Sequence, residues 1–255
     1  MYSDSHCHLD AVSEGQRPRV MAQAAAEGVV LMLTTGIDLA TSRQGVRVAR
    51  EYPSVYAGIG YHPSRAVPAP EIPYRELGEL AGSERVLAVS EIGLDFSWPG
   101  APDRETQECC FRRHVQLATE LSLPVQLHVG GAHREAYRIL QEENAFRLGG
   151  AIHEQVLTEA DLEVWLPTGF YLTVGMTVLQ TGADSEELAR VVRRIPDDRL
   201  LLETDTYSDP GEGELVGPAR VKLVAARVAA IRGTTPEELG RMTTSNLRRF
   251  LGLTG

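Results

Sequence analysis

Lysine and cysteine are both scarce in this sequence. Lys222 is the only lysine among 25 basic residues, and the cysteines are limited to Cys7, Cys109 and Cys110. An odd number of cysteines that includes an adjacent pair offers no disulfide framework, so we expect reduced thiols.

Long apolar runs and net positive charge are also lacking. No uninterrupted apolar stretch reaches the roughly 18 residues of a membrane span, and the first residues lack the plan of a signal peptide. We therefore expect a cytoplasmic protein with no membrane partner, as a monomer or small homo-oligomer. The formal net charge of −10 disfavours broad electrostatic binding of nucleic acid, although a local positive site can still exist.

Short apolar runs alternate with longer helical stretches, which predicts parallel strands connected by helices. Eight units in 255 residues give about 32 residues each, which suits an α/β fold of the (β/α)8 TIM-barrel type in a single domain, residues 1–255. A doubly wound sheet is the alternative, but no Gly-rich phosphate loop (GxGxxG, or GxxxxGK followed by Ser or Thr) occurs, which also argues against a nucleotide cofactor.

The expected elements can be placed by residue number. Helices are expected at Asp103 to Leu121 and Glu187 to Arg194, with an extra C-terminal helix from Pro236 to Phe250 and a loop from Ser208 to Gly217. The expected strands are Tyr2 to His6, Val29 to Thr35, Val55 to Gly60, Val86 to Glu91, Pro124 to His128, Gly150 to His153, Phe170 to Val174 and Leu200 to Glu203.

The first strand carries two histidines at a spacing of two. His6 and His8 therefore point to one face while Cys7 faces away as a small buried residue, so two imidazoles can meet one ion. A pair of satisfied strand-end histidines is the alternative explanation.

Four further side chains fall at or just beyond the ends of expected strands, where barrel active sites are built. With the two histidines, they form a mixed nitrogen and oxygen set that suits zinc, manganese, iron or a pair of such ions better than an all-oxygen magnesium cage. Magnesium and nickel also remain candidates for the bound metal. The four are Glu91, His128, His153 and Asp205.

Two cations held close together need a bridging carboxylate, and Glu91 is our candidate. A carbamylated lysine is excluded as the bridge, because Lys222 falls in an expected helix and no lysine lies near a strand end. The alternative for Glu91 is a buried carboxylate bonded to the backbone.

Several ordered motifs resemble the TatD-related deoxyribonuclease family of the amidohydrolase superfamily. The resemblance runs from end to end and implies a (β/α)8 barrel, divalent metals and ligation by His6, His8, Glu91, His128, His153 and Asp205. The matching stretches are Asp4-Ser5-His6-Cys7-His8-Leu9-Asp10, Gly60-Tyr61-His62-Pro63, Ser90-Glu91-Ile92-Gly93-Leu94-Asp95, Gln126-Leu127-His128, Gly169-Phe170-Tyr171, Leu202-Glu203-Thr204-Asp205 and Thr244-Ser245-Asn246-Leu247.

The sequence departs from this family mainly where substrate would bind. Val129-Gly130-Gly131 replaces the usual Ser-Arg-Asp, which removes a phosphate-binding arginine, and Glu154-Gln155-Val156-Leu157 replaces Cys-Phe-Ser-Gly. The loop of residues 209–214 is acidic where the family tends to be basic, which disfavours a polyanion. We expect a phosphoester substrate. DNA is the phosphoester that the resemblance implies.

The expected mechanism is hydrolysis by water activated between two ions. One ion is assigned to His6, His8 and Asp205 and the other to His128 and His153, with Glu91 between them. Asp205 is the candidate base, or alternatively a plain ligand.

Outside the ligand set, His62 is a candidate donor to substrate, or else a solvated loop histidine. Asp95 is a candidate partner that orients a ligand imidazole, or else a helix N-cap. His114 and His133 are expected at the surface. The rival functions are hydrolysis of a cyclic amide, ester or lactone by the same metals, and a non-catalytic metal-binding barrel.

Overall fold

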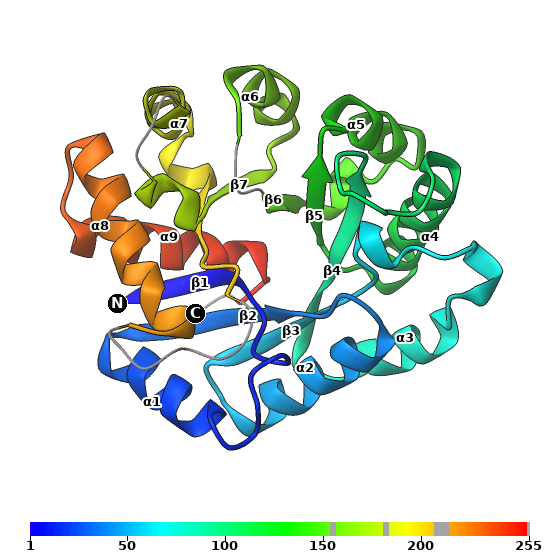
Figure 1. The fold of residues 1–255 in the computed structure, drawn as a ribbon, viewed down its shortest axis with the longest axis horizontal. Helices are drawn as coiled ribbons and strands as arrows, with labels where there is room; N and C mark the ends of the chain where they lie inside the picture. The colour runs from blue at the N-terminus through cyan, green and yellow to red at the C-terminus, as the bar shows by residue number, and fades with distance from the viewer. Residues whose placement is uncertain (154–156, 181–183, 207–214, 254–255) are drawn as a thin grey trace.

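The computed structural model describes residues 1–153, 157–180, 184–206 and 215–253 (Figure 1). Eight parallel strands form one sheet in chain order. Contacts between β1 and β8 bring the two edges together, where the Asp205 N–H donates to the His6 carbonyl at 2.9 Å. The strands are β1 (Tyr2–Cys7), β2 (Val29–Thr35), β3 (Val55–Ile59), β4 (Val86–Asp95), β5 (Val125–Gly130), β6 (Gly150–His153), β7 (Tyr171–Val174) and β8 (Leu200–Leu202).

Helices α1 to α8 lie around the outside of the strands, as Figure 1 shows. The α-helices are α1 (Arg17–Ala26), α2 (Leu39–Glu51), α3 (Tyr74–Ala81), α4 (Arg104–Leu121), α5 (His133–Glu142), α6 (Glu159–Trp165), α7 (Asp184–Arg194), α8 (Val221–Arg232) and α9 (Pro236–Phe250). The short 3-10 helices are η1 (Pro63–Arg65), η2 (Ala69–Glu71), η3 (Phe146–Leu148), η4 (Leu166–Thr168), η5 (Met176–Leu179), η6 (Asp197–Arg199) and η7 (Gly217–Arg220).

Helix α9 has its own start signal and closes one end of the barrel. Thr235 and Glu238 form a reciprocal capping box, and Pro236 occupies the first turn, where a missing N–H does no harm. Leu247 and Phe250 pack against a layer of inward side chains from alternate strands, Leu33, Ala88, Ala151 and Leu201. The candidate site residues lie towards the opposite end of the barrel, the carboxyl end of the strands, where barrel active sites are built.

The structure confirms the expected barrel with an extra C-terminal helix. One difference concerns β4, which continues past Glu91 to Asp95, because Gly93 pairs with His128 and Asp95 pairs with Gly130. Gly93 is needed there, since its φ is 143° and a Cβ atom would meet the His128 carbonyl oxygen at 2.0 Å. Glu91 therefore lies within a strand rather than at its end.

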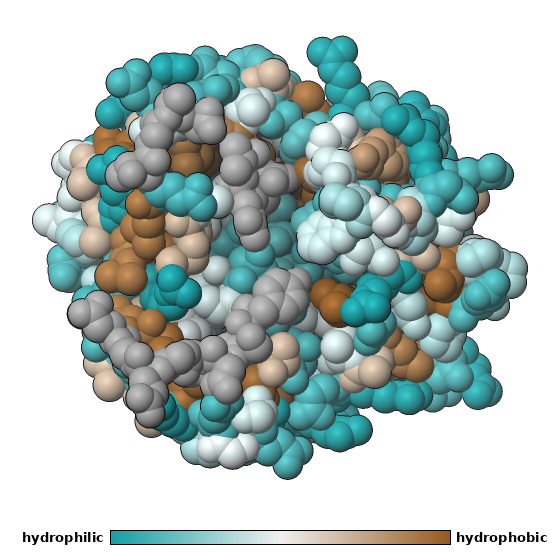
Figure 2. All heavy atoms as spheres, viewed as in Figure 1, coloured by the Kyte–Doolittle hydropathy of each residue, from teal (hydrophilic) through white to brown (hydrophobic). Residues whose placement is uncertain are grey.

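Two further features complete the fold. Of the expected loop from Ser208 to Gly217, residues 208–214 lie outside the described residues. Across the part of the chain that the structure describes, no helix combines the length and the apolar character needed to cross a membrane. Figure 2 shows hydrophilic residues at the centre of the face seen in Figure 1, inside the ring of helices.

Candidate metal centre

The six expected ligands converge at the carboxyl end of the barrel. His6 lies in β1 and His8 follows it, Glu91 lies in β4, His128 in β5, His153 ends β6, and Asp205 follows β8. The register places His128 directly opposite His153 on the neighbouring strand. Asp205 adopts a left-handed backbone with φ of 47°, a strained conformation of the kind that gathers at functional sites.

Four donor atoms meet at short range on one side of Glu91. The Nε2 atom of His6 lies 3.3 Å from His8 Nε2, 3.4 Å from Glu91 Oε2 and 3.8 Å from Asp205 Oδ1. His8 Nε2 lies 3.7 Å from Glu91 Oε2 and 3.3 Å from Asp205 Oδ1. Ligand atoms about 2.0–2.2 Å from a tetrahedrally coordinated ion lie about 3.3–3.6 Å from one another, so this spacing fits a metal ion.

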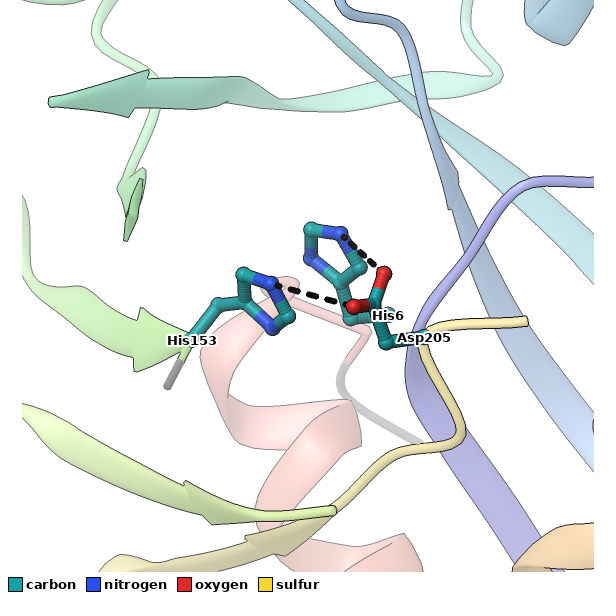
Figure 3. Close-up of side chains that lie close together, drawn as sticks. All are labelled: His6, His153 and Asp205. Atoms are coloured by element: carbon teal, nitrogen blue, oxygen red, sulfur yellow. Dashed lines mark ion pairs between the residues drawn. The ribbon is translucent and has the colours of Figure 1, made fainter. Parts of the chain in front are cut away.

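The other oxygen of Glu91 faces a second group of imidazoles. Glu91 Oε1 lies 3.0 Å from His128 Nδ1, 3.5 Å from His153 Nε2 and 3.6 Å from His62 Nε2. His153 lies between the two groups, because its Nε2 is also 4.0 Å from Asp205 Oδ2 and its ring stacks on that of His6 at 3.5 Å (Figure 3). The two carboxylate oxygens of Glu91 therefore face different sets of donors.

Buried side chains hold the Nδ1 atoms of two of these histidines. Gln126 Oε1 lies 3.0 Å from His6 Nδ1, and Glu203 Oε1 lies 2.8 Å from His153 Nδ1. Gln126 Nε2 donates to the Ser5 carbonyl at 2.8 Å, so Gln126 Oε1 accepts the Nδ1 proton of His6, which leaves the His6 Nε2 lone pair directed into the site. Lone pairs that face one another are unfavourable unless a cation lies between them.

His128 is oriented by Asp95. The carboxylate oxygen Oδ2 of Asp95 accepts from His128 Nε2 at 3.1 Å, while its Oδ1 accepts from the Ser97 and Trp98 N–H groups. Burial opposes ionisation of Asp95, but hydrogen bonds from His128 and Ser97 outweigh burial and lower the pKa of the carboxyl. With the proton on Nε2, the Nδ1 lone pair of His128 points towards Glu91.

His62 has the opposite tautomer. The Ser64 N–H donates to His62 Nδ1 at 3.1 Å, so a neutral imidazole carries its proton on Nε2, the atom that faces Glu91. Burial lowers the pKa of His62 to about 4, which keeps the ring neutral at pH 7. His62 is thus arranged to donate a hydrogen bond rather than to ligate a metal through Nε2.

The carboxylates of the centre differ in charge. Burial would raise the pKa of Glu91, but the neighbouring imidazoles, His6 foremost and then His128, hold it well below its usual range. Burial likewise opposes ionisation of Asp205, yet the hydrogen bond from His8 and the nearby His153 lower its pKa to about 2. Burial dominates at Glu203 and raises its pKa to about 8. Glu91 and Asp205 therefore supply negative charge at neutral pH.

The donor set fits a metal ion by a further criterion. Glu91 Oε2 is fully buried and has no hydrogen-bond partner among the described residues, although Glu91 is ionised. A buried carboxylate oxygen without a hydrogen bond is costly unless a cation accompanies it.

Sequence reasoning assigned no role to Gln126 and Glu203. Both are fully buried and lie two residues before an expected ligand, His128 and Asp205 respectively. The spacing of two along a strand was the available signal, because it places both members of a pair on one face. Only the fold shows that they serve His6 and His153 instead.

Cys7, His114 and His133 lie outside the donor set. Cys7 is buried, as expected, with its Sγ atom 3.4 Å from the Leu33 carbonyl oxygen. The surface placement of His114 is wrong: it is fully buried in α4, where Nδ1 donates to the Cys110 carbonyl at 2.8 Å and so satisfies one ring nitrogen. His133 is only partly exposed, because Trp165 Nε1 donates to its Nδ1 at 2.9 Å.

Known proteins resemble this chain over nearly its whole length. It is 34% identical over 254 residues to the uncharacterized metal-dependent hydrolase YabD of Bacillus subtilis, covering 98% of each chain. It is 32% identical over 245 residues to the 3′-5′ ssDNA/RNA exonuclease TatD of Erwinia tasmaniensis, covering 93% of this chain and 94% of that one.

The crystal structure of YjjV, a TatD homologue from Escherichia coli K12, has the same fold, with a TM-score of 0.86 at 24% identity over 99% of this chain and 98% of that one. A family model described as TatD related DNase matches residues 3–252. The chain therefore belongs to the TatD related DNase family.

Proposed function

We propose that this protein is a metal-dependent hydrolase of phosphoester bonds with two divalent cations. His6, His8 and Asp205 would hold one cation, His128 and His153 would hold the other, and Glu91 would lie between them. The observation that carries the proposal is the division of the Glu91 carboxylate, whose Oε2 faces His6 at 3.4 Å and whose Oε1 faces His128 at 3.0 Å. The identity of the metal stays open among zinc, manganese, magnesium, iron and nickel.

The substrate class is inferred from the relatives. The Erwinia tasmaniensis relative is named for action on single-stranded DNA and RNA, and YabD is named as a metal-dependent hydrolase. Both acidic ligands of this chain are ionised, and two dications would leave the centre with positive charge. The centre therefore suits an anionic phosphodiester better than a neutral ester.

Bound divalent cations supply an activated water and stabilise the charge that develops on a phosphoryl oxygen. The protein's own groups do the remaining work. Asp205, with a pKa of about 2, is ionised at neutral pH and able to accept the proton of the nucleophile. His62 presents its Nε2–H to the same space, where it donates to a substrate oxygen.

The test combines metal analysis with a substrate panel. Purified protein is loaded separately with each candidate cation, its metal content is measured, and turnover is compared on bis-p-nitrophenyl phosphate, single-stranded DNA, a lactone and a cyclic amide. We expect up to two ions per chain and turnover of the phosphodiesters.

The other outcomes favour the rival functions. Strong lactone or amide turnover without phosphodiester turnover would make the enzyme a hydrolase of cyclic esters or amides. Silence on every substrate by fully loaded protein would identify a non-catalytic metal-binding barrel.

A further inference from the structure

A cavity of about 350 Å³ opens beside the metal centre. It begins at Asp205 and Glu203 and extends along η5 to Arg220, the last residue of η7. The side chains that give it chemical character are those of Thr177, Gln180, Glu203, Asp205, Thr206 and Arg220.

Among the described residues that line this cavity, Arg220 is the only cationic one. It is partly exposed, and it makes no ion pair with any residue that the structure describes. Other arginines of the same half of the barrel are paired, for example Arg190 with Glu159 and Arg232 with Asp197. An unpaired guanidinium in the wall of the cavity is available to bind an anion from solution.

The backbone that leads to Arg220 is anchored by its neighbours. The Val216 N–H donates to Gln23 Oε1 of α1 at 3.0 Å. Gly217 has a φ of 53° and lies so close to α1 that a Cβ atom would meet Val20 at 2.8 Å. Pro218 and Ala219 are buried, and Arg220 follows them at the end of this anchored turn. Binding residues on anchored elements lose little freedom when a ligand arrives.

We propose that Arg220 binds a phosphate group of the substrate and that this cavity receives the nucleotide-sized part of the substrate next to the reacting bond. The proposal deepens the proposed function and rests on it. A guanidinium donates two parallel hydrogen bonds to phosphate oxygens, and Thr177, Gln180 and Thr206 add neutral polar groups to the same wall.

The placement explains how a chain with few local cations could hold a phosphoester. The sequence has Val129-Gly130-Gly131 directly after His128, and Lys222 is its only lysine. Arg220 lines the cavity from a different segment and supplies one cation. One cation and a cavity of this volume suit a mononucleotide or a strand end better than a long polyanion.

Binding is measured first, by titrating metal-loaded protein with thymidine 5′-monophosphate and with thymidine. The variants are Arg220→Gln, Arg220→Lys and the control Arg227→Gln, which removes an exposed arginine from α8. We expect Arg220→Gln to weaken monophosphate binding roughly tenfold to a hundredfold, the range for a charge-assisted hydrogen bond. Arg220→Lys should fall between, because it keeps the charge and loses the paired geometry.

Three controls decide the result. Arg227→Gln should bind the monophosphate like the parent protein, Arg220→Gln should leave any thymidine binding unchanged, and metal content and Tm should stay the same in every variant. Parent-like monophosphate binding by Arg220→Gln, no binding by the parent protein, or an equal loss in Arg227→Gln would overturn the role of Arg220.

Turnover separates this inference from the proposed function. On a short single-stranded oligonucleotide, Arg220→Gln should raise KM more than it lowers kcat. If the parent protein hydrolyses no phosphoester, the proposed function fails, while the titration still decides whether Arg220 binds phosphate.

Discussion

The two sides of Glu91 differ in burial and in number of donors. On the Oε2 side, the imidazoles of His6 and His8 are fully buried and Asp205 completes a close group of donors. On the Oε1 side, the side chain of His128 is 18% exposed, and the facing Nε2 of His62 carries a proton. The histidines of one side are fully buried, whereas the other side includes a partly exposed imidazole and a donor N–H.

This difference suggests separate duties for the two cations of our proposal. An ion with four protein donors is held mainly by the protein, whereas an ion with fewer donors keeps positions for water or substrate. The hydrogen bond from Asp205 N–H to the His6 carbonyl further ties the donors of β1 and β8 together. We expect the ion on the Oε2 side to be lost last on chelation.

The largest expected effect comes from removing the shared carboxylate. Glu91→Gln keeps the side-chain volume but replaces one charged oxygen with an amide, so the two sides no longer share an anion. We expect roughly a thousandfold loss in kcat and one ion or none per chain by elemental analysis. Far-UV circular dichroism should show the barrel intact, and full activity in this variant would remove the bridging role.

A smaller effect should distinguish the two sides. Asp95→Asn turns an amide N–H₂ towards His128 Nε2, while Gln126→Leu removes the oxygen that accepts from His6 Nδ1. Groups that orient a metal-binding imidazole are typically worth 10–100-fold in metal affinity, so we expect roughly that loss for each. In a chelator titration, Asp95→Asn should weaken the first ion lost and Gln126→Leu the last. Weakening of the same ion by both variants would contradict two distinct sides.

His62 tests whether the Oε1 side includes a donor to substrate. Replacing it in His62→Leu should lower kcat/KM by roughly tenfold, the upper range for a neutral hydrogen bond, with metal content unchanged. Because the pKa of His62 is lowered to about 4, its ring stays neutral from pH 8 down to pH 5. The pH profiles of kcat/KM for the parent protein and for His62→Leu should therefore have the same shape over that range. Loss of an ion in His62→Leu would instead make it a ligand.

His114 lies outside the metal centre, so its titration should affect the stability of the fold at acid pH without acting directly on the donors. Burial lowers the pKa of His114 to about 4, below the value of about 6.5 in the unfolded chain. The unfolded state therefore takes up the proton first, and the stability due to neutral His114 is present above pH 6.5 and is lost as pH falls towards 4.

The expected loss from His114 is on the order of 2 kcal/mol at pH 5 relative to neutral pH. Thermal unfolding of His114→Gln should show a smaller fall in Tm between pH 7 and pH 5 than the parent protein. An identical fall in both proteins would show that His114 titrates normally.

Much of the fold could be predicted because its signals are local. The strands Val29–Thr35 and Gly150–His153 and the helix Pro236–Phe250 have the bounds that their apolar runs and capping residues indicate. The end of β4 and the burial of His114 could not be read in this way. The first depends on pairing with β5, and the second on a helix face turned inward.

The sequence by itself determined the barrel, the family and the chemical identity of the donors, because unit length, strand periodicity and ordered motifs are properties of neighbouring residues. Only the tertiary structure decided which donors face each oxygen of Glu91, which ring nitrogen of His62 carries the proton, and that Arg220 reaches the cavity beside Asp205. These depend on distances of a few ångströms between segments far apart in the chain, and the closing of the sheet sets those distances.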